Sequence, residues 1–342
     1  MNANTEDHHV LPPAKIGRVL WNGRPRLVHL DAVYAAHNPL STDAAIPEPT
    51  GGELLDPTLR DVSDLFGHIY ADSLSDDLDA NLAATTCAYD SEDPRTAHRL
   101  EVALNAVRTG ERIAVDHSDL LAPVDPGKII CVGLNFAKHI EEMGHPRPDV
   151  PTLFAKFRDA ITDPFKQVTL PAGAGEKLDY EGEYAIVIGR TAWQVDPAEA
   201  AKCIAGEMIM NDFTQRDRQY ATEQWLQGKT LQGCSGMGPW VTLSDDGRFS
   251  LDGWAEREQR VLRTWVNGEL RQEASLGDLV FPPAALVSYI SQFVTLNAGD
   301  VISTGTPAGV GHGRGVYLRS GDTVRIAIDG LGAIENTYVA AS

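Results

Sequence analysis

Cysteine is scarce in this chain of 342 residues, and the four that occur lie far apart. Cys87, Cys131, Cys203 and Cys234 form no Cys-x-x-Cys pair. Their spacing excludes the common zinc frameworks and a disulfide-stapled secreted fold. We therefore expect buried free thiols in a reducing compartment.

Long apolar runs and positive charge are also lacking. No apolar run approaches the roughly 20 residues of a membrane-spanning helix. The N-terminal segment has no basic stretch followed by an apolar one, so we expect no secretion signal, and a cytoplasmic location. Lys and Arg total 29 against 48 Asp and Glu, a formal net charge of −19. Because phosphate binding needs a basic surface, this negative charge argues against a nucleic-acid partner, and it also disfavours an anionic membrane surface. A small anionic substrate remains compatible with it if a metal or local Lys and Arg side chains make the pocket positive.

Turn residues divide the chain into two predicted parts. Asn22-Gly23 sits between apolar runs and predicts a hairpin over residues 16–33, and residues 95–108 have helical spacing. Pro123, Pro126 and Gly127 then interrupt the pattern. We predict a small N-terminal α/β domain over 1–122, with 1–15 as a loose tail, and a catalytic domain over 123–342.

Strand signals dominate the second part. Apolar runs closed by Gly, Asn or Asp occur at 128–133, 152–156, 184–188, 261–266, 301–304 and 323–328. Asn267-Gly268 predicts another hairpin turn. Helical spacing is confined to about 197–207, 213–227 and 283–293. Many strands with few helices favour a β-rich α+β fold over a doubly wound sheet.

Glu181 and Glu183 head one of these apolar runs and are two residues apart. Side chains alternate along a strand, so both carboxylates point the same way, followed on that face by Ala185 and Val187. Unpaired carboxylates aimed at an apolar interior are costly, and a divalent cation removes that cost. Oxygen ligands suit Mg²⁺, Mn²⁺ or Ca²⁺ better than zinc, while a solvated strand edge is the alternative.

Asp212 offers a third carboxylate after the apolar stretch 206–211. Asp212, Arg216 and Gln219 have the spacing of one helix face, which predicts a metal ligand beside groups that bind a substrate carboxylate. The alternative for Asp212 is a helix N-cap.

His139 and Glu142 are neighbours if the chain is helical from Asn135 onward. A carboxylate beside an imidazole fixes its tautomer and favours a water-activating base, and an ordinary surface pair is the alternative. Lys156 in a strand and Lys229 in a loop are unpersuasive alone. The glycine-rich segment 305–315 lacks the Gly-Lys-Ser/Thr of a phosphate loop, so we predict a tight loop in which Thr306 faces a ligand.

Taken together, these motifs resemble the fumarylacetoacetate hydrolase family over about residues 126–340. Their joint order and spacing are specific, although each is modest alone. The motifs are Val132–Glu142, Phe154–Lys156, Asp179–Glu183, Asn211–Gln219, Gly228-Lys229, Gly238–Trp240 and Ser303–Gly311. The N-terminal hairpin and helix resemble the small extra domain of bacterial members.

The resemblance implies a fold of mixed sheets rolled around a metal site, and a homodimer. It implies Mg²⁺ or Mn²⁺ on Glu181, Glu183 and Asp212, and a water-activating pair at His139 and Glu142. It also implies a small 2-oxo acid as substrate. The implied catalytic lysines are Lys156 and Lys229, and the implied substrate-binding residues are Arg216, Gln219 and Thr306.

We therefore expect a hydrolase that cleaves a C–C bond in a 2,4-dioxo acid such as an acylpyruvate or fumarylpyruvate, with the pyruvate enolate stabilised by the metal. The alternatives are an oxaloacetate decarboxylase, a 2-hydroxy-dienoate isomerase or decarboxylase, and a non-catalytic binding or scaffold protein. Two segments depart from the family pattern, Leu231–Gly236 and His312–Val316. Both departures concern the choice of substrate and leave the implied metal ligands unchanged.

Overall fold

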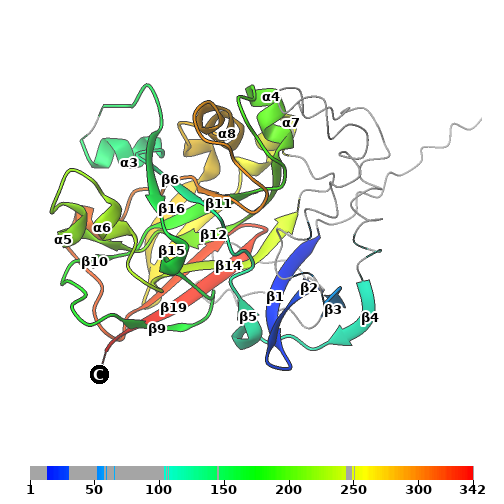
Figure 1. Cartoon of the computed structure of the whole chain (residues 1–342). Coiled ribbons are helices and arrows are strands. Elements are labelled where there is room, and N and C mark those ends of the chain that lie inside the picture. The colour runs from blue at the N-terminus through cyan, green and yellow to red at the C-terminus, as the bar shows by residue number, and fades with distance from the viewer. Residues whose placement is uncertain are drawn as a thin grey trace, which may run out of the picture.

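The computed structural model describes residues 14–30, 52–57, 59, 65, 104, 106, 108–144, 146–243, 249 and 251–341 (Figure 1). Cys87, most of the predicted tail and most of the helix predicted at 95–108 lie outside these residues. The tail prediction is one residue too long, because Lys15 is already the first residue of a strand.

One large mixed sheet runs through the molecule, in the order β4-β3-β2-β1-β14-β12-β11-β17-β6-β7. Most neighbours are antiparallel, but β17 and β6 are parallel. The strands are β1 (Lys15–Trp21), β2 (Arg24–Leu30), β3 (Gly52–Leu55), β4 (Arg108–Ile113), β6 (Ile129–Gly133), β7 (Thr152–Lys156), β11 (Gly182–Ile188), β12 (Ile204–Asn211), β14 (Ser235–Leu243) and β17 (Val301–Ser303), with β5 (Leu120–Leu121) on β1 and β8 (Ile161–Thr162) on β14.

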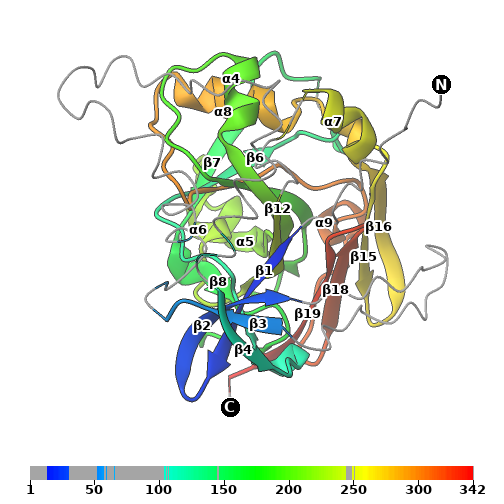
Figure 2. The same ribbon diagram turned by 90° about the vertical axis from the view of Figure 1, so that its right-hand side faces the viewer.

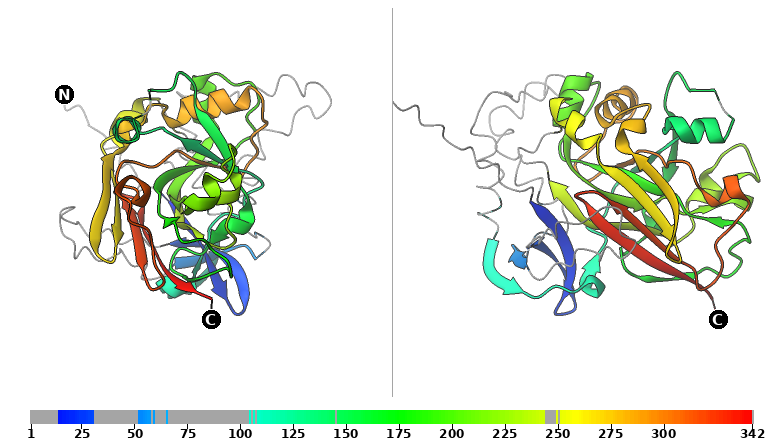
Figure 3. Two further views of the ribbon diagram at one scale, coloured as in Figure 1. Left: turned by 90° about the vertical axis from the view of Figure 1, so that its left-hand side faces the viewer. Right: turned by 180° about the vertical axis from the view of Figure 1, so that it is seen from behind.

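A second sheet packs against the first, and its strands lie side by side in Figure 2. Figure 3 shows the red C-terminal strands next to the yellow β15–β16 hairpin. The order is β16 (Glu269–Ser275), β15 (Val261–Val266), β18 (Thr323–Ile328), β19 (Gly332–Ala340) and β9 (Gln167–Leu170), and a separate short pair joins β10 (Leu178–Asp179) to β13 (Thr214–Gln215).

The described helices are short and lie around the sheets. α4 packs against α8 at one end of the molecule, and α5 packs against α6 at another (Figure 1). The helices are α3 (Ala137–Glu142), α4 (Pro197–Lys202), α5 (Arg216–Gln219), α6 (Leu226–Lys229), α7 (Leu251–Arg257), α8 (Pro283–Ser291) and α9 (Gly311–Arg314), with 3₁₀ turns η2 (His117–Asp119), η3 (Arg158–Ala160) and η4 (Leu276–Asp278).

β11 is buried along its whole length because both of its faces are covered. Tyr184, Ile186 and Ile188 belong to one apolar core, while Ala185 and Val187 belong to another on the opposite face. The alternation predicted from the sequence is confirmed. A strand covered on both faces gives its side chains fixed positions, which suits a binding site at its end.

Both predicted hairpin turns are present. Asn22 and Gly23 have positive φ values of 50° and 74°, and Asn267 and Gly268 have values of 51° and 81°. Asn and Gly tolerate this left-handed conformation, which matches the twist of the flanking strands. The first hairpin is described to Leu30, so residues 31–33 of its prediction lie outside the described chain.

Two predicted helices are wrong in extent. The helix predicted over 197–207 ends at Lys202, because residues from Ile204 enter β12 and are buried on both faces. The helix predicted over 213–227 is divided into β13, α5 and α6. The third, predicted over 283–293, is confirmed as α8 with an earlier end.

The predicted β-rich α+β fold is confirmed by the two mixed sheets. The separate small N-terminal domain stays a prediction, and β1 pairs with β14 across the proposed boundary through Lys15↔Thr242 and Ile16↔Val241. Within the described ranges, no helix combines the length and apolar character that a membrane span requires.

Candidate metal centre and surrounding site

Antiparallel pairing brings the three predicted metal ligands together. Gly182 at the start of β11 pairs with Asn211 at the end of β12. Glu181 therefore lies next to Asp212, whose backbone N–H donates to the Glu181 carbonyl at 2.9 Å. Glu183 is one pleat further along β11. The carboxylate oxygens of Glu181, Glu183 and Asp212 approach within 4.8 Å of one another, and all three residues are buried.

Of the three carboxylates, Glu183 has the pKa that is raised by its surroundings. Burial and the neighbouring carboxylates of Asp212 and Glu181 raise its pKa well above the usual range. Its Oε2 accepts hydrogen bonds from the Ser303 hydroxyl at 2.5 Å and the Gly305 backbone N–H at 3.0 Å. These donors orient the carboxylate, and Oε1 is left for a ligand.

Two buried lysines balance part of the negative charge. The Lys229 ammonium lies 2.7 Å from Glu181 Oε2 and 2.7 Å from Asp212 Oδ2. Burial opposes its charge, but Asp212 and Glu181 raise the pKa of Lys229 above its usual value. Lys156 at the end of β7 lies 2.8 Å from Asp212 Oδ1 and donates to the carbonyls of Phe213 and Lys229. Both lysines predicted from the family resemblance therefore contact the carboxylate cluster.

Arg216 and Gln219 also lie at the cluster, on α5. Arg216 Nη2 contacts Glu181 Oε1 at 2.6 Å, and Nη1 donates to Gln219 Oε1 at 2.8 Å. Burial alone would raise the pKa of Glu181, but Lys229 and Arg216 hold it below the usual value. The predicted shared helix face is wrong, because Asp212 precedes β13 and is not on a helix. It is not an N-cap either, since Gln215 precedes the helix.

His139 and Glu142 are paired on α3 as predicted. His139 Nδ1 and Glu142 Oε2 are 3.0 Å apart, and the imidazole is largely buried. Nδ1 faces the carboxylate, so Nε2 is the nitrogen left to exchange a proton. Glu142 also accepts the Gly309 backbone N–H at 3.2 and 3.3 Å through its two oxygens.

Thr306 lies in the predicted tight loop, which ends in α9. Its hydroxyl donates to the Gly182 carbonyl at 2.9 Å and accepts from Gln272 Nε2 at 2.8 Å. Gln272 Oε1 in turn accepts the Gly182 N–H at 3.0 Å. Thr306 therefore supports the backbone between the two glutamates, and its predicted contact with substrate stays a prediction.

The sequence motifs did not identify three residues that contact the site: Asp179, Gln272 and Ser303. Asp179 is fully buried and its Oδ2 accepts from Arg216 Nε at 2.8 Å. A signal for it existed, because Asp179, Glu181 and Glu183 continue the same period of two. Gln272 and Ser303 come from distant strands, and no local pattern marks them.

Gly182 has no room for a side chain. A Cβ there would lie 2.2 Å from Thr264 Oγ1 and 3.1 Å from the Ile326 side chain, because β15 and β18 cover this face. Gly182→Ala should therefore destabilise the fold by about 1–3 kcal/mol, the usual effect of overpacking. Thermal unfolding measures this effect. Gly268→Ala is the comparison without overpacking, because no atom lies within 4 Å of the added Cβ and only the backbone strain of a positive φ is introduced.

The donor set fits a hard divalent cation. Buried carboxylate oxygens are the ligands that Mg²⁺, Mn²⁺ and Ca²⁺ prefer. A cation would offset both the burial and the neighbouring carboxylates that raise the pKa of Glu183. With all groups ionised, a divalent cation would change the net charge of the cluster from −1 to +1. The groups are Lys156, Lys229 and Arg216 against Asp179, Glu181, Glu183 and Asp212.

The fold and the carboxylate cluster define a candidate metal centre at the ends of β11 and β12. The model of the fumarylacetoacetate (FAA) hydrolase C-terminal family matches residues 128–339. The chain belongs to the fumarylacetoacetate hydrolase family, which is a family of enzymes.

Three similar proteins differ in the reaction that their names describe. A mitochondrial oxaloacetate tautomerase of Xenopus laevis is 36% identical over 266 residues, 74% of this chain and 81% of the relative. A fumarylacetoacetate hydrolase structure from Exiguobacterium antarcticum is 30% identical with a TM-score of 0.69, over 96% of this chain and 100% of that one. A 5-carboxymethyl-2-hydroxymuconate delta-isomerase structure from Mycobacterium smegmatis is 29% identical with a TM-score of 0.65, over 96% and 99%.

Proposed function

We propose that the chain is a metal-dependent hydrolase that cleaves the C3–C4 bond of a 2,4-dioxo acid of the acylpyruvate or fumarylpyruvate type. The observation that supports it most is the pairing of a buried carboxylate triad with the His139–Glu142 pair. Mg²⁺ or Mn²⁺ on Glu181, Glu183 and Asp212 would supply Lewis acidity toward the 2-keto oxygen. A homodimer stays a prediction.

The anionic end of the substrate would be held by Arg216. A guanidinium has five N–H donors, and three contacts use Nε, Nη1 and Nη2 once each. The two remaining N–H groups can meet a carboxylate. Lys156 and Lys229 add positive charge where negative charge develops on the substrate, which is the kind of electrostatic stabilisation that lowers barriers most.

His139 would take a proton from water through Nε2 while Glu142 holds Nδ1. The water oxygen adds to the C4 carbonyl, the C3–C4 bond breaks, and its electron pair moves to C3 and the 2-keto group. The acyl part leaves as a carboxylic acid, and the pyruvate enolate takes a proton at C3. One water is consumed, and no oxidant or reductant is needed.

A second candidate is keto–enol tautomerisation of oxaloacetate. The observation that favours it is that relatives from Xenopus laevis, Bos taurus and Homo sapiens, at 36–38% identity, are named oxaloacetate tautomerases. Here His139 would move a proton at C3 and no water would attack. Decarboxylation of oxaloacetate and isomerisation of a hydroxy-dienoate require the same stabilised enolate.

Product analysis separates these candidates. The protein with Mn²⁺ or Mg²⁺ should convert acetylpyruvate into acetate and pyruvate. With oxaloacetate, a tautomerase speeds exchange between enol and keto forms without making pyruvate, whereas a decarboxylase makes pyruvate. A metal-loaded protein that tautomerises oxaloacetate and leaves acylpyruvates intact would replace the hydrolase proposal with the second candidate. Inertness toward every 2-oxo acid would favour a non-catalytic binding protein.

A further inference from the structure

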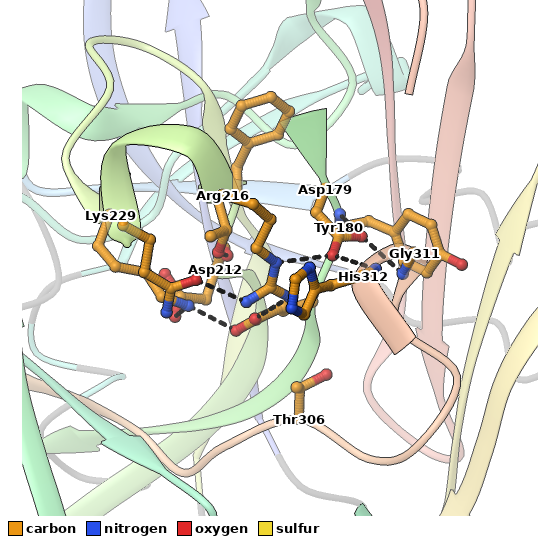
Figure 4. Close-up of polar contacts among 12 residues, drawn as sticks. Asp179, Tyr180, Asp212, Arg216, Lys229, Thr306, Gly311 and His312 are labelled. Atoms are coloured by element: carbon orange, nitrogen blue, oxygen red, sulfur yellow. Dashed lines mark hydrogen bonds and ion pairs between the residues drawn. The ribbon is translucent and has the colours of Figure 1, made fainter. Parts of the chain in front are cut away.

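Asp179 is a fully buried carboxylate that meets four donors. Its Oδ2 accepts from Arg216 Nε at 2.8 Å and from the His312 backbone N–H at 2.9 Å. Its Oδ1 accepts from the backbone N–H groups of Gly311 at 2.7 Å and Tyr180 at 2.9 Å. Figure 4 shows the carboxylate between the guanidinium and the start of α9.

The segment Gly309–Gly313 connects this carboxylate to the His139–Glu142 pair. At its first residue, the Gly309 N–H donates to both oxygens of Glu142. The Gly309 carbonyl accepts from the Tyr180 hydroxyl at 2.9 Å. At its other end, a Cβ on Gly313 would lie 3.3 Å from Glu142 Oε1. The same five residues therefore contact Asp179 on one side and Glu142 on the other.

We propose that Asp179 is a positioning residue that couples substrate-carboxylate binding at Arg216 to the orientation of the catalytic imidazole, through the segment Gly309–Gly313. This inference rests on the proposed function, because it needs Arg216 and His139 to act on one substrate. A buried carboxylate with four donors cannot turn without releasing one of them. Asp179 therefore fixes the position of the Arg216 guanidinium relative to the loop that contacts Glu142.

Asp179→Asn tests the coupling with almost no change in volume. An amide offers one accepting oxygen, and its NH₂ group would face two of the four donors. We expect KM for an active 2-oxo acid to rise and kcat to fall, each by about 10-fold or more, as expected when buried donors lose their acceptor. Oxalate affinity, measured by calorimetry on the Mn²⁺-loaded protein, should fall in parallel while Mn²⁺ affinity stays within about 3-fold.

Asp300→Asn is the matched control. Asp300 is also buried and accepts the backbone N–H groups of Lys128 at 2.9 Å and Asn297 at 2.7 Å, and it pairs with the Lys128 ammonium at 2.7 Å. Asp300→Asn should lower the thermal stability of the protein as Asp179→Asn does. KM, and kcat per metal-loaded molecule, should stay those of the wild type, because Asp300 contacts neither Arg216 nor the loop.

A double-mutant cycle tests the route of coupling. If Asp179 acts through the loop on Glu142, the effects of Asp179→Asn and Glu142→Gln on the activation free energy should be non-additive. The double variant should then have about the kcat of the less active single variant. Asp300→Asn with Glu142→Gln should show the product of the two single effects. Multiplicative effects for the Asp179 pair would remove the loop from the proposal.

The result that overturns the inference is distinct from failure of the proposed function. If the wild type turns over a 2-oxo acid and Asp179→Asn keeps its KM and oxalate affinity, the coupling is wrong and the function stands. If Asp179→Asn loses only stability, as Asp300→Asn does, Asp179 is structural. If the wild type neither binds oxalate nor acts on any 2-oxo acid, the function fails, and the coupling fails with it.

Discussion

Glu183→Gln should lower the affinity for Mn²⁺ or Mg²⁺ by more than about 100-fold, because even changes around a ligand shell cost about 10–100-fold. Of the three proposed ligands, Glu183 is the most suitable to change, since its oxygens pair with no lysine or arginine in the described contacts. Replacing Glu181 or Asp212 would remove one of the two carboxylates that pair with the buried Lys229 ammonium. Calorimetric titration of the metal-free protein measures the effect directly.

The same change should leave the metal-free protein as stable as the wild type, or more stable, at pH 7–8. The pKa of Glu183 is raised well above its usual value by burial and by the nearby carboxylates. A carboxyl group with a raised folded-state pKa contributes stability below its unfolded-state pKa and loses it as pH rises through the folded-state value. Gln is neutral at every pH and avoids this loss.

Metal should then stabilise the wild type much more than the variant. At a metal concentration 100 times its own dissociation constant, the wild type gains about 2.7 kcal/mol. At that concentration a variant with 100-fold weaker binding gains about 0.4 kcal/mol. Glu207→Gln is the matched control, because Glu207 is a buried glutamate on β12 that pairs with Arg260 and Tyr184 instead. Wild-type metal affinity in Glu183→Gln would show that the triad is not the metal site.

His139→Ala should reduce acylpyruvate hydrolysis by about 10²–10⁴-fold, the usual contribution of a general base. The imidazole contacts Glu142 and none of the triad carboxylates in the described contacts, so Mn²⁺ and oxalate affinities should stay near those of the wild type. Any decarboxylation of oxaloacetate should be largely spared, because that reaction needs no attacking water. Steady-state rates on both substrates give the comparison.

Lys138→Ala controls for disturbance of α3, since Lys138 is an exposed neighbour on the same helix. It should keep both activities. Equal loss of hydrolysis and decarboxylation in His139→Ala would count against water activation and would assign the imidazole a part common to both reactions.

The sequence was sufficient for the parts of the site that follow a local period. The alternation from Asp179 to Val187 is fixed by the geometry of an extended chain, so two glutamates could be placed on one face without a structure. Asp212 could be proposed as their partner, but its position depends on the antiparallel pairing of β11 with β12. That pairing joins segments separated by α4, and no local pattern specifies it.

The segment around Arg216 shows why helical spacing misled. Residues 213–227 contain enough polar and apolar alternation to suggest one helix, but Thr214 is taken into β13 by pairing with Asp179. α5 and α6 are then held by close packing, since a Cβ on Gly228 would lie 2.4 Å from the Gln219 backbone nitrogen. Four-residue helices depend on such tertiary contacts, and their own sequence does not stabilise them.

The end of β14 that pairs with the hairpin strand β1 would become an unpaired edge if the chain were cut at the start of the family match, whereas its beginning would still pair with β8. The backbone groups that Val241 and Thr242 direct toward β1 would lose their partners, and so would the Leu243 N–H, which donates to the Ala14 carbonyl at 2.8 Å. An unpaired edge beside buried apolar residues recruits strands from other molecules. We therefore expect the opening hairpin to protect this edge of the sheet from self-association, and a shortened chain to need a replacement strand to stay monodisperse.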